Sequence, residues 1–263
     1  WQALLAAVGI FIVLLTLAAA SIGAVWSSAS PDFGVQGVLD RFGQTEPKVL
    51  IACDGYYYAG KTVDVLGKLG EIVGQLPSVK RVVVVPYVHH DHDLSHVPHA
   101  RMYADFIAPF HFVDDIEFAE LPFDHPLYIM YSSGTTGVPK CIVHCAGGAL
   151  LQHLKEHQLQ GDVKPGDRVF YFTTCGWMMW NWLVSGLALG ATLVLFDGSP
   201  FHPTAERLID LIDAENISLF GTSAKFIAAL EKAGAKPRET HKLNHLKAIL
   251  STGSPLAHES FEY

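Results

Sequence analysis

The residues with the clearest capacity for chemistry lie in one short loop, "YSSGTTGVPK", at positions 131–140. Gly134 and Gly137 permit positive φ angles and close approach of the backbone to a ligand. Successive N–H groups in such a loop can form an anion-binding nest, and Lys140 adds a mobile positive charge. Hydroxyl groups come from Ser132, Ser133, Thr135 and Thr136. This composition favours a polyphosphate ligand, although a plain turn has similar composition and the Gly-x-x-x-x-Gly-Lys-Ser/Thr spacing of the nucleotide P-loop is absent.

A second candidate is the aromatic stretch "CGWMMWNW" at 175–182. Trp177, Met178, Met179 and Trp180 follow Gly176 at the start of a predicted helix. Aromatic and Met side chains at helical spacing usually face a core, and they can equally line an apolar ligand pocket. Both interpretations stay open at this point.

Histidine and cysteine are concentrated in two further stretches. The first, "VHHDHDLSHVPHA" at 88–100, contains His89, His90, His92, His96 and His99 with Asp91 and Asp93. Imidazoles and carboxylates can bind Zn²⁺, but a structural site needs a rigid tetrahedral arrangement, which adjacent loop residues do not imply. The second, "CIVHC", has Cys141, His144 and Cys145 but no second ligand pair, and we expect small buried residues with Cys145 in a helix. We predict no metal site.

The elements that must position these residues alternate between β-rich apolar runs and amphipathic patterns. Predicted strands cover 24–28, 48–53, 81–88, 127–133, 168–174, 191–197, 218–223 and 248–253. Predicted helices cover 3–20, 34–44, 62–75, 144–159, 177–188, 203–214, 223–233 and a segment after Pro255. Strand–helix alternation with nearly continuous Val, Ile and Leu strands predicts an α/β fold with mainly parallel sheets covered by helices.

Bulk composition excludes several classes of protein. The 263 residues carry a net charge of −8, which argues against a general nucleic-acid surface. Four cysteines in a chain of this length favour reduced thiols and a cytoplasmic location. The run from Ala3 to Ala20 has only Thr16 as a polar side chain; we expect a helix buried on all sides, with a membrane segment over 3–25 as the alternative.

The loop and its neighbouring motifs resemble the adenylate-forming enzymes, which include acyl-CoA synthetases, luciferases and peptide-synthetase adenylation domains. Among these, the resemblance is to acid–CoA ligases that act on acetoacetate. It runs from about Ser21 to Tyr263 and covers part of the family's large N-terminal domain. The motifs are "YSSGTTGVPK", "WSSASPDFG" (26–34), "GVLDRF" (37–42), "GWMMWNW" (176–182), "DGSP" (197–200) and "STGSPL" (251–256).

The resemblance implies a two-step reaction that uses ATP, Mg²⁺ and CoA: a short carboxylic acid becomes an acyl-AMP, which the CoA thiol then converts to a thioester. It assigns the β- and γ-phosphates to residues 132–137 and Lys140, with Lys140 and Thr136 taken as catalytic. Gly253, Ser254 and Pro255 match the segment along the adenine. Trp177, Met178 and Met179 match the acyl pocket.

The resemblance also suggests where CoA would bind. "SPDFG" (30–34) and "DGYYYAGK" (54–61) match segments that contact the CoA nucleotide, with Lys61 as a phosphate partner. Related enzymes often have Arg where Tyr58 stands, which places that contact in doubt. "GTSAKF" (221–226) resembles a segment near the pantetheine tunnel, and the His-rich stretch falls in a variable surface loop. For each of these CoA segments, a solvated loop without a ligand is the alternative.

The same resemblance predicts two sub-domain portions, approximately 1–115 and 116–263. It places the magnesium-binding Glu, the ribose-binding Asp and a C-terminal domain with its catalytic Lys beyond Tyr263. We therefore expect an internal piece of a longer ligase that is inactive alone. The alternative is a non-catalytic nucleotide-binding or membrane-anchored module that kept the fold without the chemistry.

Overall fold

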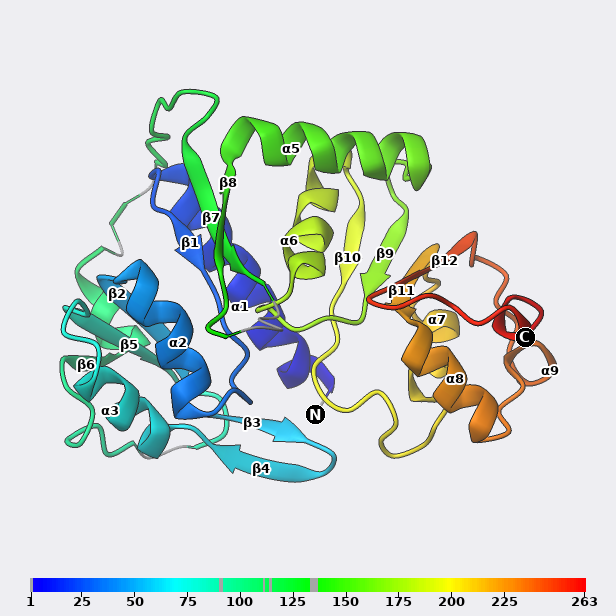
Figure 1. Ribbon diagram of the computed structural model, residues 1–263, viewed down its shortest axis with the longest axis horizontal. Helices are drawn as coiled ribbons and strands as arrows, with labels where there is room; N and C mark the ends of the chain where they lie inside the picture. The colour runs from blue at the N-terminus through cyan, green and yellow to red at the C-terminus, as the bar shows by residue number, and fades with distance from the viewer. Residues whose placement is uncertain (1, 90–91, 111, 114, 133–136) are drawn as a thin grey trace. The chain divides into compact units, whose positions relative to one another are not determined.

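The computed structural model describes the whole chain except residues 1, 90–91, 111, 114 and 133–136, and side chains in α1 from residue 9 onward. It consists of two compact units (Figure 1). The continuous unit is formed by residues 15–146. The discontinuous unit is formed by residues 1–14 and 147–263. Each unit is described by itself below.

A parallel three-stranded sheet forms the main core of the continuous unit. Its strand order is β2 (Val49–Cys53), β5 (Arg81–Val85) and β6 (Ala100–Met102). Helices α2 (Val35–Thr45) and α3 (Leu66–Gly74) bury Phe42 and Leu69 with this sheet in one hydrophobic cluster. The centre of β5 is almost fully buried, as expected for a strand with both faces covered.

The continuous unit also contains two smaller β structures. Strand β7 (Pro126–Tyr131) pairs in parallel with β1 (Trp26–Ser27) and antiparallel with β8 (Cys141–Cys145). Strands β3 (Gly55–Tyr58) and β4 (Lys61–Asp64) form a separate hairpin. Its two-residue turn, Ala59 and Gly60, has positive φ at both positions, which suits the right-handed twist of the flanking strands. Helix α4 (Tyr103–Ile107) and the 3₁₀ turn η1 (Ala108–Phe110) follow β6.

The discontinuous unit contains a four-stranded parallel sheet. Its order is β10 (Thr192–Val194), β9 (Arg168–Tyr171), β11 (Leu219–Ser223) and β12 (Ala248–Thr252). Because side chains alternate along a strand, β9 has two different faces. Phe170 stacks on Phe220 in the cluster with α7 (Arg207–Ala214) and α8 (Ala224–Lys232). Val169 and Tyr171 pack in the cluster with α6 (Met178–Ser185).

Helix α1 (Gln2–Ser21) packs less completely than the apolar sequence suggests. Val13 is buried against Trp180 and Val184, whereas Ile10 and Leu14 are about half exposed. The expectation of a helix covered on all sides is therefore wrong along its described side chains, because only one stripe of the helix meets α6. Of the helices in the described part of the chain, none is long and apolar enough to cross a membrane.

The predicted α/β class with mainly parallel sheets is confirmed, but three helix starts are wrong. The predicted helix 203–214 begins only at Arg207, as α7. The predicted helix 62–75 begins only at Leu66, because residues 61–64 complete the β3–β4 hairpin. The predicted helix 144–159 begins at Ala146, where α5 (Ala146–Lys155) leads into the π-helical turn η2 (Glu156–Gln160). Residues 141–145 instead pair with β7, so Cys145 lies in a strand and Cys141 is exposed rather than buried.

The remaining elements are short. Residues 186–189 form the 3₁₀ turn η3 (Gly186–Leu189), and α9 (Pro237–Thr240) follows α8. The helix expected after Pro255 is only the 3₁₀ turn η4 (Glu259–Phe261). Strand β6 and α9 were not predicted, since three- or four-residue elements carry too little periodicity to detect. The division into sub-domains near residue 115 stays a prediction.

Candidate functional site

The loop that joins β7 to β8 is closed at its base. The N–H of Ser132 donates to the carbonyl of Lys140 at 3.0 Å, and the N–H of Lys140 donates to Oγ of Ser132 at 3.0 Å. Two hydrogen bonds between the same two residues fix where the loop leaves and rejoins the sheet. The predicted phosphate ligands Ser133, Gly134, Thr135 and Thr136 lie outside the described residues.

Side chains of helix α2 and strand β1 form hydrogen bonds with residues at this base. Nε2 of Gln44 donates to the carbonyl of Pro139 at 2.8 Å. The hydroxyl of Tyr131 lies 2.7 Å from Oγ of Ser27 and 3.3 Å from Oγ1 of Thr45. The motifs "WSSASPDFG" and "YSSGTTGVPK" therefore meet through the side chains of Ser27 and Tyr131.

The described part of the loop beyond its base is open. Gly137 has φ +136°, and a Cβ placed on it would meet no atom of the described residues within 4 Å, its chain neighbours aside. The side chain of Lys140 is exposed, and within the described residues its ammonium group has no ion-pair partner. An uncommitted cation next to a glycine with free space is suited to an anionic ligand.

The predicted adenine segment belongs to the discontinuous unit. Gly253, Ser254 and Pro255 follow β12 directly and are exposed. Gly253 has φ +91°, and a Cβ on it would lie 3.8 Å from Cζ2 of Trp177. Two segments far apart in sequence, one matching the adenine site and one matching the acyl pocket, thus meet at the carboxyl end of the sheet.

The three predicted acyl-pocket residues do not share one environment. Trp177 and Met178 are 37% and 39% exposed, whereas Met179 is 8% exposed and packs within the core cluster of β9 and α6. Successive residues at a helix start point in different directions, so the three side chains differ in exposure. The assignment of all three to an acyl pocket stays a prediction.

Tyr171 is a residue that the sequence analysis did not single out. It is buried, and its hydroxyl donates to the carbonyl of Thr222 at 3.0 Å. Burial raises its pKa to about 12, so the phenol keeps its proton. Its ring meets the rings of Trp177 and Trp182 edge-on, each at a centroid distance of 6.0 Å. No local sequence feature distinguishes it, because the run "RVFYF" is typical of buried strands in general.

Lys61, the predicted CoA partner, lies at the tip of the β3–β4 hairpin. It pairs with Tyr58 across the hairpin, and both side chains are exposed. In the other predicted CoA segment, Phe33 packs beneath the guanidinium of Arg41, whose Cζ lies 4.4 Å from the ring centroid. Lys61 is therefore accessible to a ligand, and Phe33 is held by a cation–π contact.

Asp54, which opens the "DGYYYAGK" segment, is fully buried and tightly bonded. Oδ1 accepts the N–H groups of Tyr87 and Val88, and Oδ2 accepts the N–H of His89. Nε2 of His92 lies 2.7 Å from Oδ2. Burial would raise the pKa of this carboxyl, but the hydrogen bonds from Val88, His92, His89 and Tyr87 outweigh burial and lower it.

The His-rich stretch is therefore not simply a surface loop. The His92 side chain is buried against Asp54, while His89 makes an exposed contact of 3.1 Å with Asp64. His90 and Asp91 lie outside the described residues. The described residues contain no group of three or more His, Cys, Asp or Glu that could hold a metal ion. All four cysteines are free thiols.

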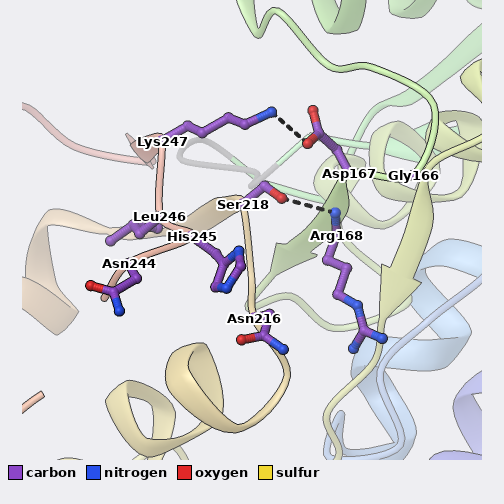
Figure 2. A pocket seen from close by; sticks show the side chains of 9 residues that line it. All are labelled: Gly166, Asp167, Arg168, Asn216, Ser218, Asn244, His245, Leu246 and Lys247. Atoms are coloured by element: carbon purple, nitrogen blue, oxygen red, sulfur yellow. Dashed lines mark hydrogen bonds and ion pairs between the residues drawn. The ribbon is translucent and has the colours of Figure 1, made fainter. Parts of the chain in front are cut away.

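A polar cavity of about 390 Å³ lies at the opposite edge of the discontinuous unit's sheet (Figure 2). Its lining comes from the amino-terminal ends of β9, β11 and β12, and Figure 2 shows the Lys247–Asp167 ion pair (2.6 Å) across it. None of the predicted site residues lines it. In parallel α/β sheets ligands bind at the carboxyl ends of the strands, so this cavity is separate from the candidate site.

Comparison with known proteins gives similar sequences along nearly the whole chain. The chain is 56% identical over 252 residues to "Acetoacetyl-coenzyme A synthetase" of Rhizobium meliloti, covering 95% of this chain and 38% of that protein. It is 54% identical over 260 residues to "Acetoacetyl-CoA synthetase" of Danio rerio, covering 97% and 39%. It is 47% identical to "Malonamoyl-CoA synthetase vrtB" of Penicillium aethiopicum, covering 94% and 37%.

The fold is similar as well. The solved "Acetoacetyl-CoA Synthetase from Streptomyces lividans" matches 95% of this chain with a TM-score of 0.87 and 41% identity, and the match covers 38% of that structure. The chain thus spans less than two-fifths of the length of these relatives. The family model described as "AMP-binding enzyme" matches residues 3–262, and the chain belongs to this family of AMP-binding enzymes.

Proposed function

We propose that this chain is part of an ATP-dependent acid–CoA ligase that activates acetoacetate. The observation that carries the proposal is the closed base of the 132–140 loop, which leaves Lys140 uncommitted within the described residues. The supporting context is the similarity to acetoacetyl-CoA synthetases along almost the whole chain. A carboxylate is a poor electrophile, and adenylation converts it into a mixed anhydride with a good leaving group.

In the first step, a carboxylate oxygen attacks the α-phosphorus of ATP and pyrophosphate leaves. Residues 132–137 would donate backbone and hydroxyl hydrogens to the β- and γ-phosphate oxygens, and Lys140 would neutralise charge that moves onto the pyrophosphate. The open side of Gly137 fits a bulky anion. Thr136 is proposed to act with Lys140. Mg²⁺ supplies further neutralisation when bound, and the described residues offer no cluster of ligands for it.

The discontinuous unit contains the segments that we propose for the adenine and the acyl group. Gly253, Ser254 and Pro255 form an exposed turn after β12 that would lie along the adenine. Trp177 and Met178 would contact the acyl group, and the distance between Trp177 and Gly253 supports adjacent binding of the two groups. In the second step the CoA thiol attacks the acyl carbon and AMP leaves. Lys61 would pair with a phosphate of CoA.

The two candidate acids, acetoacetate and malonamate, differ in one group. Acetoacetate and malonamate have the same number of heavy atoms, with a methyl group in one where the other has an amino group. An amide buried without hydrogen-bond partners is costly. The exposed groups at the start of α6 are the apolar side chains of Trp177 and Met178, which favour the methyl ketone. The relative named for malonamoyl-CoA makes malonamate the appropriate competitor to test.

The test is ATP–pyrophosphate exchange in the full-length protein, measured with acetoacetate, malonamate and acetate. We expect exchange to depend on the acid, with the highest kcat/KM for acetoacetate. A higher kcat/KM for malonamate would keep the adenylation chemistry but reassign the substrate. Absence of exchange with all three acids, from a protein that binds ATP, would favour the alternative of a non-catalytic nucleotide-binding module.

We also propose that residues 1–263 alone do not form acyl-CoA. More than half the length of the curated relatives has no counterpart in this chain, and the resemblance assigns the ribose-binding Asp, the magnesium-binding Glu and a catalytic Lys to that remainder. Purified residues 1–263 should therefore show no acetoacetate-dependent exchange. Measurable exchange would contradict this part of the proposal.

A further inference from the structure

The wall beside the candidate acyl site is built from residues of β9 and β11, the segment after β12 and the start of α6. Its exposed member is Trp177, which precedes α6 and faces Gly253. On its solvent side, a partly exposed indole has few contacts that could define its orientation. Whatever fixes its orientation must act from the buried side, where Tyr171 meets it.

Tyr171 is itself held in a single position. Its ring occupies the space in front of Gly221, the residue paired with it on β11. A Cβ on Gly221 would overlap three ring atoms of Tyr171, so a larger residue at 221 would push the ring away. The Tyr171 hydroxyl also donates to the carbonyl of Thr222 at 3.0 Å, which fixes the far end of the ring.

The contact between the two rings has a defined geometry. The planes of Tyr171 and Trp177 meet at 75° with centroids 6.0 Å apart, an edge-to-face arrangement that is favourable and directional. On its other side, Tyr171 makes a similar contact with Trp182, at 77° and 6.0 Å. Two ring contacts and a hydrogen bond hold the Tyr171 ring, and the position of this ring restricts the orientation of Trp177.

Resting on the function proposed above, we infer that Tyr171, seated on Gly221, is a positioning residue that sets the orientation of Trp177 and thereby the affinity for the short acyl substrate. Tyr171 is buried and would act through Trp177, which we propose contacts the acyl group. Its effect therefore falls on the acid more than on ATP. The requirement for glycine at 221 follows from the same contact.

The first test compares three variants of the full-length protein. Tyr171→Leu removes the ring, Tyr171→Phe keeps the ring and loses one hydrogen bond, and Phe170→Leu is the matched control. Phe170 is equally buried on the same strand but packs on the opposite face of the sheet, away from Trp177. Both Leu variants lose a large core side chain, so thermal stability should fall in both.

We expect Tyr171→Leu to raise the KM for acetoacetate about tenfold or more while the KM for ATP changes by less than about twofold. Tyr171→Phe should restore most of the affinity for acetoacetate. Phe170→Leu should leave the ratio of the two KM values unchanged. Equal effects of Tyr171→Leu and Phe170→Leu on this ratio would overturn the inference, since a general loss of stability would then explain both.

A second readout does not depend on catalysis. The fluorescence of Trp177 is isolated by subtracting the spectrum of a Trp177→Phe partner variant, and its quenching by acrylamide is measured in each background. Quenching of Trp177 should increase in Tyr171→Leu and in Gly221→Ala, and remain unchanged in Phe170→Leu. Unchanged quenching in Tyr171→Leu would refute the positioning role, whether or not the protein proves to be an acetoacetate ligase.

The last test uses the variant Gly221→Ala. Since its methyl group would displace the Tyr171 ring, it should reproduce the effect of Tyr171→Leu on the acid KM. In the double variant Gly221→Ala/Tyr171→Leu, the second change should add less than about twofold. Fully multiplicative effects would show that the two positions act independently and would contradict the coupling inferred here.

Discussion

Two loops of the continuous unit differ in how their polar groups are bonded. The stretch 87–92 is tied to the buried carboxylate of Asp54, which accepts three backbone N–H groups and contacts His92. In the 132–140 loop, the hydrogen bonds of the described residues join Ser132 and Lys140 at the base, and the ammonium of Lys140 has no ion-pair partner in the described part of the chain. A polar group whose bonds are satisfied within the protein stabilises the fold. One left open can bind a ligand.

The largest expected effect is on catalysis through Lys140. In the full-length protein, Lys140→Ala should lower acetoacetate-dependent ATP–pyrophosphate exchange by about 100-fold, because one charge-stabilising group is lost from the transition state. The melting temperature should change little, since the side chain is exposed. Lys68→Ala, an exposed lysine on α3 in the same unit, is the matched control and should leave exchange intact. Unchanged exchange in Lys140→Ala would remove this residue from the site.

The second effect is on stability through Asp54. Asp54→Asn should lower the free energy of unfolding by about 3 kcal/mol, because a buried network loses its charge and at least one acceptor. Chemical denaturation measures this change. Asp64→Asn is the control: its carboxylate is exposed and contacts His89, so its loss should cost no more than about 0.5 kcal/mol. Similar costs for the two variants would remove the distinction between the buried and exposed carboxylates.

The third effect is the contribution of Asp54 to the dependence of stability on pH. The pKa of Asp54 is lowered from its ordinary value of 3.8, so the unfolded state binds the proton more readily. Its contribution to stability is then complete above that value and is lost as the pH falls through the lower pKa of the folded state. The free energy of unfolding, measured by chemical denaturation between about pH 5 and pH 2, should decrease less with falling pH for Asp54→Asn than for the unmodified protein. Parallel curves would contradict the assignment.

The smallest effect concerns the base of the 132–140 loop. Ser132→Ala removes the acceptor of the Lys140 N–H but leaves the other hydrogen bond of the pair in place. We expect a loss of about 1 kcal/mol in binding of ATP, close to a fivefold rise in its Kd. Ser132→Thr keeps the hydroxyl and should restore affinity, which calorimetry can measure. A failure of Thr to restore affinity would show that the hydroxyl is not what closes the loop.

Much of the fold could be predicted because its signals are local. The apolar run "RVVVV" and the alternation of strands with amphipathic helices indicate a covered parallel sheet, and β5 and the two parallel sheets are found as expected. The errors lie where tertiary pairing overrides a local pattern. Residues 61–64 and 141–145 were assigned wholly or partly to helices, but each pairs with a strand just before it in the chain.

The candidate site was predictable to a similar degree. The motif "YSSGTTGVPK" predicts a phosphate loop from its own residues, and the structure shows Ser132 and Lys140 together at its base; its phosphate role stays a prediction. The sequence could not separate Met179 from Trp177 and Met178, because the face of α6 that meets β9 depends on how the helix packs. It also gave no reason to select Tyr171, whose role depends on residues 50 positions away, such as the paired Gly221.

By itself, the sequence determined the class of fold and the membership in a family, because both depend on residues that are adjacent in the chain; the phosphate role of the 132–140 loop stays a prediction. Only the tertiary structure decided which polar groups form hydrogen bonds within the protein. Asp54 meets His92 across a separation of 38 residues, and Gly253 meets Trp177 across the end of a sheet. Burial and hydrogen bonding are properties of packed neighbours, and packing is set by strand register and helix faces rather than by residue type.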